Sequence, residues 1–150
     1  MNYLGNLNDV ARKYLEQGNV AEFNALRHVN PYWLPDLPGV VVNNKSLTGI
    51  NLEGTMMQRS TLVNVTINSP SNLRDINISG SQLNNFNIDG IDVGRGNFQD
   101  VKADEKCSFK NVSINKGAYE RSSHSVRTLW ERGNPGKAEE LGFKRSGKIL

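Results

Sequence analysis

The residue types that most often do chemistry are few in this chain, and their spacing does not suit a site. The two histidines, His28 and His124, stand far apart, and Cys107 is the single cysteine. A zinc site needs three or four closely grouped His, Cys or carboxylate ligands, so the sequence predicts no metal site. We interpret His28 as a structural residue at a helix end and Cys107 as a small core residue.

Carboxylates and glycines offer two further possibilities for a reactive site. Neighbouring carboxylates occur in two places, Asp89 with Asp92 and Asp100 with Asp104 and Glu105. A pair of this kind could act in acid–base catalysis, but each falls at a corner of the repeat described below, where we expect it to be solvated. The segment 94–98 lacks the strand-then-helix context of a phosphate-binding loop. We therefore expect no catalytic residue and no cofactor, and we interpret the chain as a non-enzyme.

An apolar residue recurs at every fifth position through the middle of the chain. A helix repeats every 3.6 residues and a strand every two, so this period indicates a short unit that turns a corner each time and stacks into a solenoid. One extra residue interrupts the count after Ile67 and another after Ala103. Four units to a coil would stack these residues in four ladders: Leu37, Met57, Ile78, Phe98 and Tyr119; Val42, Leu62, Leu83 and Ala103; Leu47, Ile67, Ile88 and Phe109; Leu52, Leu73, Val93 and Ile114.

The residues around each ladder position fit the same architecture. The residue two places earlier is small or apolar, as strand alternation requires of a second inward position. Pairs such as Ser79-Gly80 and Asp89-Gly90 follow the ladder positions, and glycine and asparagine suit tight corners because they tolerate a positive φ. The two extra residues predict bulges at Asn68–Asn72 and Asp104–Cys107.

Units such as SLTGI, NLEGT, NISGS and NIDGI resemble those of pentapeptide-repeat proteins. The resemblance covers residues 35–119 and implies an all-β solenoid, a right-handed four-sided β-helix of nearly four coils. It also implies that residues 1–34 form the helical leader that often precedes such repeats, with residues 120–150 as a C-terminal helix and basic tail. Members of this family have many unrelated roles, so the fold does not carry a function.

Both ends of such a column need a cover, because a stacked coil exposes its core and a strand edge. At the first end we expect Gly18 to separate two helices and four apolar residues to close the column: Phe23, Leu26, Trp33 and Leu34. At the last end, Val126, Leu129 and Trp130 form one apolar face of a predicted helix. This helix either caps its own column or pairs with a second copy, and we expect a homodimer joined through residues 122–143.

Composition and the start of the chain bear on the cellular location of the protein. The mean hydropathy is −0.53, no apolar run is long enough to span a membrane, and the start of the chain does not resemble a signal peptide. With one cysteine, no disulfide framework can form within the chain. The sequence therefore predicts a cytoplasmic protein with no membrane partner.

Charge bears on the best-known activity of the resembling family, the imitation of DNA by strongly acidic members that bind DNA gyrase, a type II topoisomerase. Residues 37–119 carry eight Lys or Arg and seven Asp or Glu, so the column offers no acidic face. DNA mimicry is therefore the alternative interpretation. Direct nucleic-acid binding by the basic tail is not expected either, since no aromatic residues interleave with its cations.

The sequence thus favours a non-enzymatic scaffold that presents a rigid surface to a protein partner, in an immunity, resistance or effector-accessory role. Loops added to solenoids often form the recognition face. The candidate contacts are the cations near the two predicted bulges: Arg74, Lys102, Lys106 and Lys110.

Overall fold

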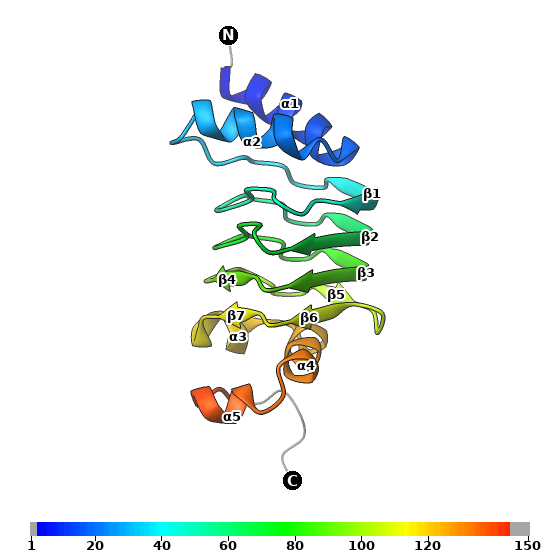
Figure 1. Ribbon diagram of the computed structural model, residues 1–150, viewed down its shortest axis with the longest axis vertical. Coiled ribbons are helices and arrows are strands. Elements are labelled where there is room, and N and C mark those ends of the chain that lie inside the picture. The colour runs from blue at the N-terminus through cyan, green and yellow to red at the C-terminus, as the bar shows by residue number, and fades with distance from the viewer. Residues whose placement is uncertain (1–2, 145–150) are drawn as a thin grey trace.

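The computed structural model describes residues 3–144 and shows a column of stacked coils with helices at both ends (Figure 1). Helices α1 (Tyr3–Gln17) and α2 (Val20–Val29) lie over the first coil. Helices α3 (Lys116–Arg121), α4 (His124–Gly133) and α5 (Lys137–Leu141) lie at the opposite end. None of the helices in the described part of the chain is long and apolar enough to cross a membrane.

Every strand of the column pairs in parallel with the strand one coil away. The main sheet contains β1 (Val41–Ser46), β2 (Thr61–Asn68), β3 (Gln82–Asp89), β5 (Lys102–Ala103) and β6 (Ser108–Lys110). A second sheet pairs β4 (Asp92–Gly94) with β7 (Ser113–Ile114). Single bridges, such as Met56 with Asn77, hold the shorter sides together.

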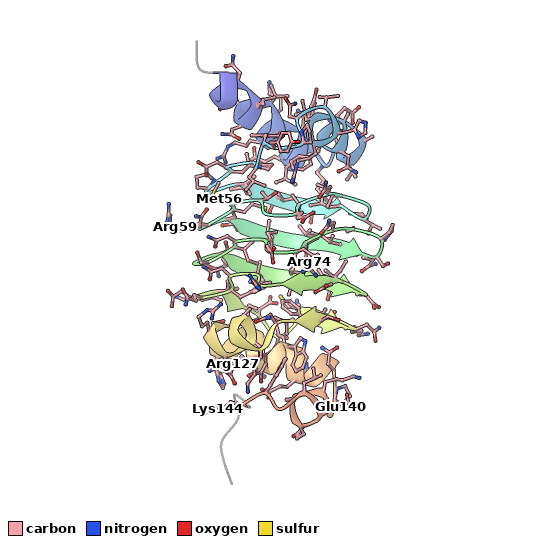
Figure 2. The ribbon with its side chains drawn as sticks, turned by 90° about the vertical axis from the view of Figure 1, so that its left-hand side faces the viewer. Met56, Arg59, Arg74, Arg127, Glu140 and Lys144 are labelled. Carbon is pink, nitrogen blue, oxygen red and sulfur yellow. The ribbon has the colours of Figure 1, made fainter. Side chains whose placement is uncertain are left out.

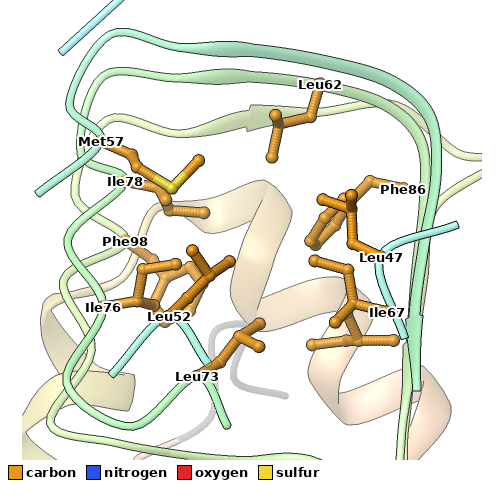
Figure 3. A pocket seen from close by; sticks show the side chains of 11 residues that line it. Leu47, Leu52, Met57, Leu62, Ile67, Leu73, Ile76, Ile78, Phe86 and Phe98 are labelled. Atoms are coloured by element: carbon orange, nitrogen blue, oxygen red, sulfur yellow. The ribbon is translucent and has the colours of Figure 1, made fainter. Parts of the chain in front are cut away.

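The register confirms four units to a coil. Val42 pairs with Leu62, Leu62 with Leu83, and Leu83 with Ala103, so Leu62 and Leu83 stack on one side. Both are almost fully buried, at 2% and 0% exposure. Figure 3 looks into the column, where side chains from all four sides meet at the centre, with Leu62 pointing in from one of them. The four-sided β-helix implied by the family resemblance is therefore confirmed.

The two predicted bulges are also confirmed, because the pairing offset changes across each. Lys45 pairs with Val65, a separation of 20 residues, whereas Asn51 pairs with Asn72, a separation of 21. The extra residue therefore falls within Asn68–Asn72. Leu83 pairs with Ala103 and Ile88 with Phe109, which places the second extra residue within 104–107.

The last coil departs from the prediction at two ladder positions. Ser113 pairs with Asp92, but Ile114 pairs with Gly94 rather than with Val93, across a register irregularity. Tyr119 is not a fifth rung, because the side chain of Asn115 caps α3 by accepting the N–H of Gly117 and the chain turns into a helix. The expected boundary after residue 119 therefore falls inside α3. Tyr119 is still buried, 5.1 Å from the ring of Trp130.

Small polar side chains inside the column bind backbone groups of the coil above. The N–H of Val40 donates to Ser60 Oγ at 3.1 Å, and the N–H of Ser60 donates in turn to Ser81 Oγ at 2.9 Å. The N–H of Phe86 donates to the thiol sulfur of Cys107 at 3.3 Å. These bonds explain why small polar residues replace aliphatic ones at inward positions, since a buried unpaired N–H is costly.

One corner of the column carries a ladder of asparagines. Asn44, Asn64 and Asn85 have φ values of 56°, 55° and 51°, a left-handed conformation that asparagine tolerates better than most residues. The amide of Asn64 donates to Asn44, and that of Asn85 donates to Asn64. In the last coil Asp104 directly follows Ala103, the partner of Leu83, and its carboxylate accepts the N–H of Asn85 at 3.0 Å. That bond, with others to the same carboxylate, lowers the pKa of Asp104.

Candidate functional site

The residues considered first for chemistry do not form a site. Cys107 is buried, and burial raises the pKa of its thiol to about 11, which keeps the sulfur protonated and unreactive at neutral pH. His28 and His124 are both exposed. No three His, Cys, Asp or Glu side chains within the described residues are placed to hold a metal ion.

The interior of the column offers no room for a ligand. The space between the ladders measures about 10 Å³, and its walls are entirely apolar, including Leu52, Met57 and Phe98 (Figure 3). A water molecule needs roughly 10–15 Å³ and several polar partners. Any function of the column therefore lies on its surface or at its ends.

The four predicted partner contacts do not form one patch. Lys102 lies in β5, Lys106 in the turn that follows, and Lys110 at the end of β6, so these three follow one another along the last coil. Arg74 belongs to another side of the column (Figure 2), where its guanidinium pairs with the carboxylate of Asp92. Lys102 and Lys110 lie opposite the two ends of β3, with the bulge at Asp104–Cys107 between them, and Arg74 stands apart.

The three residues predicted for a cap or dimer helix face their own column. Val126, Leu129 and Trp130 in α4 are buried within a single chain. The indole N–H of Trp130 donates to the carbonyl of Val112 in the last coil at 2.8 Å. Their apolar face is therefore already covered, and a dimer would have to use other parts of residues 122–143.

Polar side chains of α1 bind the free edge of the first coil, a feature that the sequence analysis missed. Asn8 Oδ1 accepts the N–H of Asp36 at 3.1 Å, Arg12 donates to the carbonyl of Pro38 at 2.7 Å, and Glu16 accepts the N–H of Val41 at 3.0 Å. A spacing of four residues places these three side chains on one helix face. That spacing was the signal available in the sequence.

Helix α2 continues this edge around the next two sides. The amide of Asn24 donates to the carbonyl of Gly49 and accepts the N–H of Asn51. Arg27 donates to the carbonyls of Asn51 and Glu53, at 3.0 and 2.9 Å. Burial lowers the pKa of Arg27.

The last coil is capped in the same way. Ser125 Oγ accepts the N–H of Ala103 and donates to the carbonyl of Val101. The amide of Asn134, just after α4, accepts the N–H of Val112 and donates to the carbonyl of Phe109. The side-chain amide of Asn134 therefore makes the two hydrogen bonds that backbone groups of a further coil would otherwise make.

Three large apolar side chains are exposed at the first end, in and just after the last residue of α2. Val29, Tyr32 and Leu34 are 69%, 97% and 54% exposed, and we call these three residues the Tyr32 surface. Leu34 was predicted to close the column, and that prediction is wrong. In this extended segment its neighbours Trp33 and Pro35 point inward, so Leu34 must point outward.

The turn that carries Tyr32 is held at both ends. The N–H of Trp33 donates to the carbonyl of Asn30 at 3.1 Å, which closes a tight turn with Pro31 and Tyr32 at its centre. The indole of Trp33 is buried and donates to Asn8 Oδ1 at 2.9 Å. Proline also fixes one backbone angle of the turn. A large aromatic side chain is thus presented to solvent from a rigid support.

An open groove lies at the other end, beside β7 and the C-terminal helices. Its lining includes Val112 and Ile114 of the last coil, Lys116 of α3, Trp130 of α4, and Lys137 and Leu141 of α5. We call it the C-terminal groove. Leu141 is 53% exposed, so the groove is apolar at its base and open to solvent.

Comparison with known proteins finds similar chains among the solved structures. No family model matches the chain, and no curated protein matches it. The chain is similar to HetL, a pentapeptide repeat protein involved in heterocyst differentiation regulation in the cyanobacterium Nostoc, with 15% identity over 55% of this chain and 39% of HetL, at a TM-score of 0.29. It is also similar to a pentapeptide repeat protein of the cyanobacterium Cyanothece, with 14% identity over 54% of this chain and 81% of that one, at a TM-score of 0.21.

The chain spans about two fifths of the length of HetL. At these identities and TM-scores we carry over no activity and no partner. The pentapeptide-repeat architecture is established by the pairing register of the chain itself, with four units in each coil and 20 or 21 residues between paired positions.

Proposed function

We propose that this pentapeptide-repeat β-helix is a non-enzymatic scaffold that holds a partner protein against the Tyr32 surface. The observation that carries the proposal is the exposure of Val29, Tyr32 and Leu34 within six consecutive residues. Large apolar side chains grouped on a surface are typical of interaction sites. Tyrosine in particular is enriched among the residues that dominate binding energy.

The rigidity of the turn supports the same proposal. Binding costs free energy when side chains and loops become ordered, and the turn at Asn30–Trp33 is already fixed by a hydrogen bond and by the buried Trp33. The segment leaves α2 at the edge of the molecule (Figure 1), where a partner can approach it. An immunity, resistance or effector-accessory role would use a surface of this kind.

DNA mimicry toward a type II topoisomerase stays the alternative, and charge is the evidence that bears on it. A mimic needs a continuous acidic face, because duplex DNA carries one negative charge per ~1.7 Å of its axis. On this column Arg74 lies beside Asp92 and pairs with it, and Arg59 projects from the edge (Figure 2). Mixed charges of this kind favour the scaffold proposal.

A crosslinking experiment tests the Tyr32 surface directly. A photoreactive phenylalanine analogue is placed at Tyr32 and, as a matched control, at Gln82, an exposed position in β3. We expect a discrete crosslinked partner in the source cells from position 32 and none from position 82. Unlabelled protein should compete for that partner, whereas the variant Tyr32→Ser should not.

Two outcomes contradict this proposal. The first is the same set of crosslinked species from both positions, which would indicate non-specific contact. The second is competition by Tyr32→Ser as strong as that by the unchanged protein. In either case the cations of the last coil, Lys102, Lys106 and Lys110, become the next contacts to test by charge reversal.

A further inference from the structure

The C-terminal groove lies beside a strand that no further strand covers within residues 3–144. In the described part of the chain, β7 is the last strand of the column and pairs only with β4 in its two-stranded sheet. Among the hydrogen bonds of residues 3–144, those from the C-terminal helices to this edge end at Val112, where Asn134 and Trp130 bind its N–H and carbonyl. An edge strand of this kind can accept an added strand from another chain.

The side chains around this edge suit a bound segment. Ile114 is half-buried and Leu141 is exposed, while Trp130 and Phe143 stack with ring centroids 5.5 Å apart beneath them. This apolar base can bind alternate side chains of an extended segment, because a strand directs every second side chain to the same face.

The charges at the rim decide what kind of segment fits. Among the residues that the structure describes, the charged ones lining the groove are Lys116 and Lys137, both exposed, and no acidic residue lines it. Lys137 pairs with Glu140 at 3.0 Å, but an exposed pair of this kind is weak and screened. We propose that the C-terminal groove binds an extended acidic segment of another protein as an added strand beside β7.

Two other occupants fit the charges less well. Residues 145–150 of this chain carry Arg145 and Lys148 and no acidic residue, so they would meet the two rim lysines with like charge. A second copy would bring its own Lys116 and Lys137 to the contact. Like charges brought together across an interface are unfavourable, and an acidic segment avoids that cost.

This proposal is independent of the proposed function, because the groove and the Tyr32 surface lie at opposite ends of the column (Figure 1). A variant in one region leaves the residues of the other unchanged. Failure of one proposal is therefore distinguishable from failure of the other.

The test uses the full chain and a labelled eight-residue peptide in which aspartate alternates with isoleucine or valine. Fluorescence anisotropy should show saturable binding, and a peptide with lysine in place of aspartate should not bind. Reversing both rim charges, Lys116→Glu with Lys137→Glu, should weaken binding at least about tenfold. The control reverses two cations of the same coil outside the groove, Lys102→Glu with Lys110→Glu, and should leave binding unchanged.

A second peptide separates strand addition from plain charge attraction. N-methylation of alternate peptide nitrogens removes the donors of one edge and keeps every charge, so binding should be lost for one of the two methylation patterns only. Equal binding of both methylated peptides, equal binding of the lysine peptide, or no binding at all would overturn the proposal.

The two competing occupants of the C-terminal groove, residues 145–150 and a second copy of the chain, would each give a different experimental result. If the acidic peptide binds only to a variant that ends at Lys144, residues 145–150 occupy the groove. If light scattering shows a dimer that Leu141→Asp converts to a monomer, a second copy occupies it. Each of these results would overturn the proposal in favour of the occupant named.

Discussion

The hydroxyl and thiol groups inside the column give a first prediction at the scale of single residues. Ser81→Ala removes the acceptor of the Ser60 N–H, which is buried between two coils. A buried donor left unpaired costs about 1–3 kcal/mol, so urea unfolding should show a loss of that size. Ser79→Ala is the matched control, since Ser79 is not fully buried and lies outside the inward positions. Equal stability of both variants would mean that the hydroxyl of Ser81 contributes nothing.

Leu83 tests the core in the same way. It is fully buried between Leu62 above and Ala103 below, so Leu83→Ala should destabilise the protein by about 2–5 kcal/mol. Val63→Ala, at a partly exposed position in β2, is the control and should cost less. A thermal melt in which Leu83→Ala costs under about 1 kcal/mol would contradict the central place of this residue.

The lowered pKa of Asp104 gives a prediction of how the free energy of unfolding depends on pH. The N–H of Asn85 lowers the pKa of this carboxyl in the folded protein, so the charged form is favoured by folding. The stabilisation is therefore fully present above the unfolded pKa of about 3.9 and is lost as the pH falls through the folded pKa. Urea unfolding between pH 6 and pH 2 should show this loss, and the slope should be smaller in Asp104→Asn. An unchanged slope in that variant would assign the acid sensitivity to other carboxyls.

The helices at the two ends are the elements that stop the column, and they do so with polar side chains as well as apolar ones. Arg27→Ala removes the donors bound by the carbonyls of Asn51 and Glu53. Hydrogen bonds from charged groups contribute about 1.5–3 kcal/mol, so a loss of at least about 2 kcal/mol is expected. Exposed strand edges also associate, so sedimentation should show larger species. Lys13→Ala, at an exposed position of α1, is the control, and the same behaviour in both variants would contradict the capping role.

The sequence alone predicted the features that depend on residues close together in the chain. The five-residue period placed Leu62 and Leu83 in one ladder, and the two extra residues in that period located both bulges. Both predictions succeed because each unit depends on its own corner and on neighbours at a fixed distance in the sequence. The caps could not be predicted to the same depth. Arg27 and Asn134 bind carbonyls and N–H groups more than 20 residues away, and no sequence pattern specifies such partners.

The predictions that the structure contradicts, and the surfaces that were not predicted, have physical causes of the same kind. Tyr119 keeps the period of five but lies in α3, because Asn115 provides a helix cap at that point and the local helix signal outweighs the repeat. Leu34 is apolar but exposed, since alternation with Trp33 and Pro35 decides its direction. Surfaces such as the Tyr32 surface and the C-terminal groove combine distant segments or depend on exposure, so neither could be derived from spacing.

At the scale of the whole molecule, the column is short, and helices of the same chain cap both of its ends, apart from the edge at β7. Side chains from α1 and α2 bind the first edge, and α4 with Asn134 binds the last. The two proposed binding regions lie at these ends rather than along the sides (Figure 1). A partner at one end and a second at the other would therefore be held at a fixed separation by the stack of coils between them.

The pairing of Leu62 with Leu83 also means that residues 62–82 are one complete coil, and the molecule should be able to grow by copying it. A tandem duplication of residues 62–82 keeps the native contacts with the coils above and below, adds one contact between two identical coils, and leaves both caps intact. The longer protein should fold, melt at no lower temperature, and gain about 4.8 Å in length by small-angle scattering. Unfolding or aggregation of this variant would show that the coils are not interchangeable. If the duplicated variant folds, then duplication of single coils within the gene is a route by which a column of this kind can change its length.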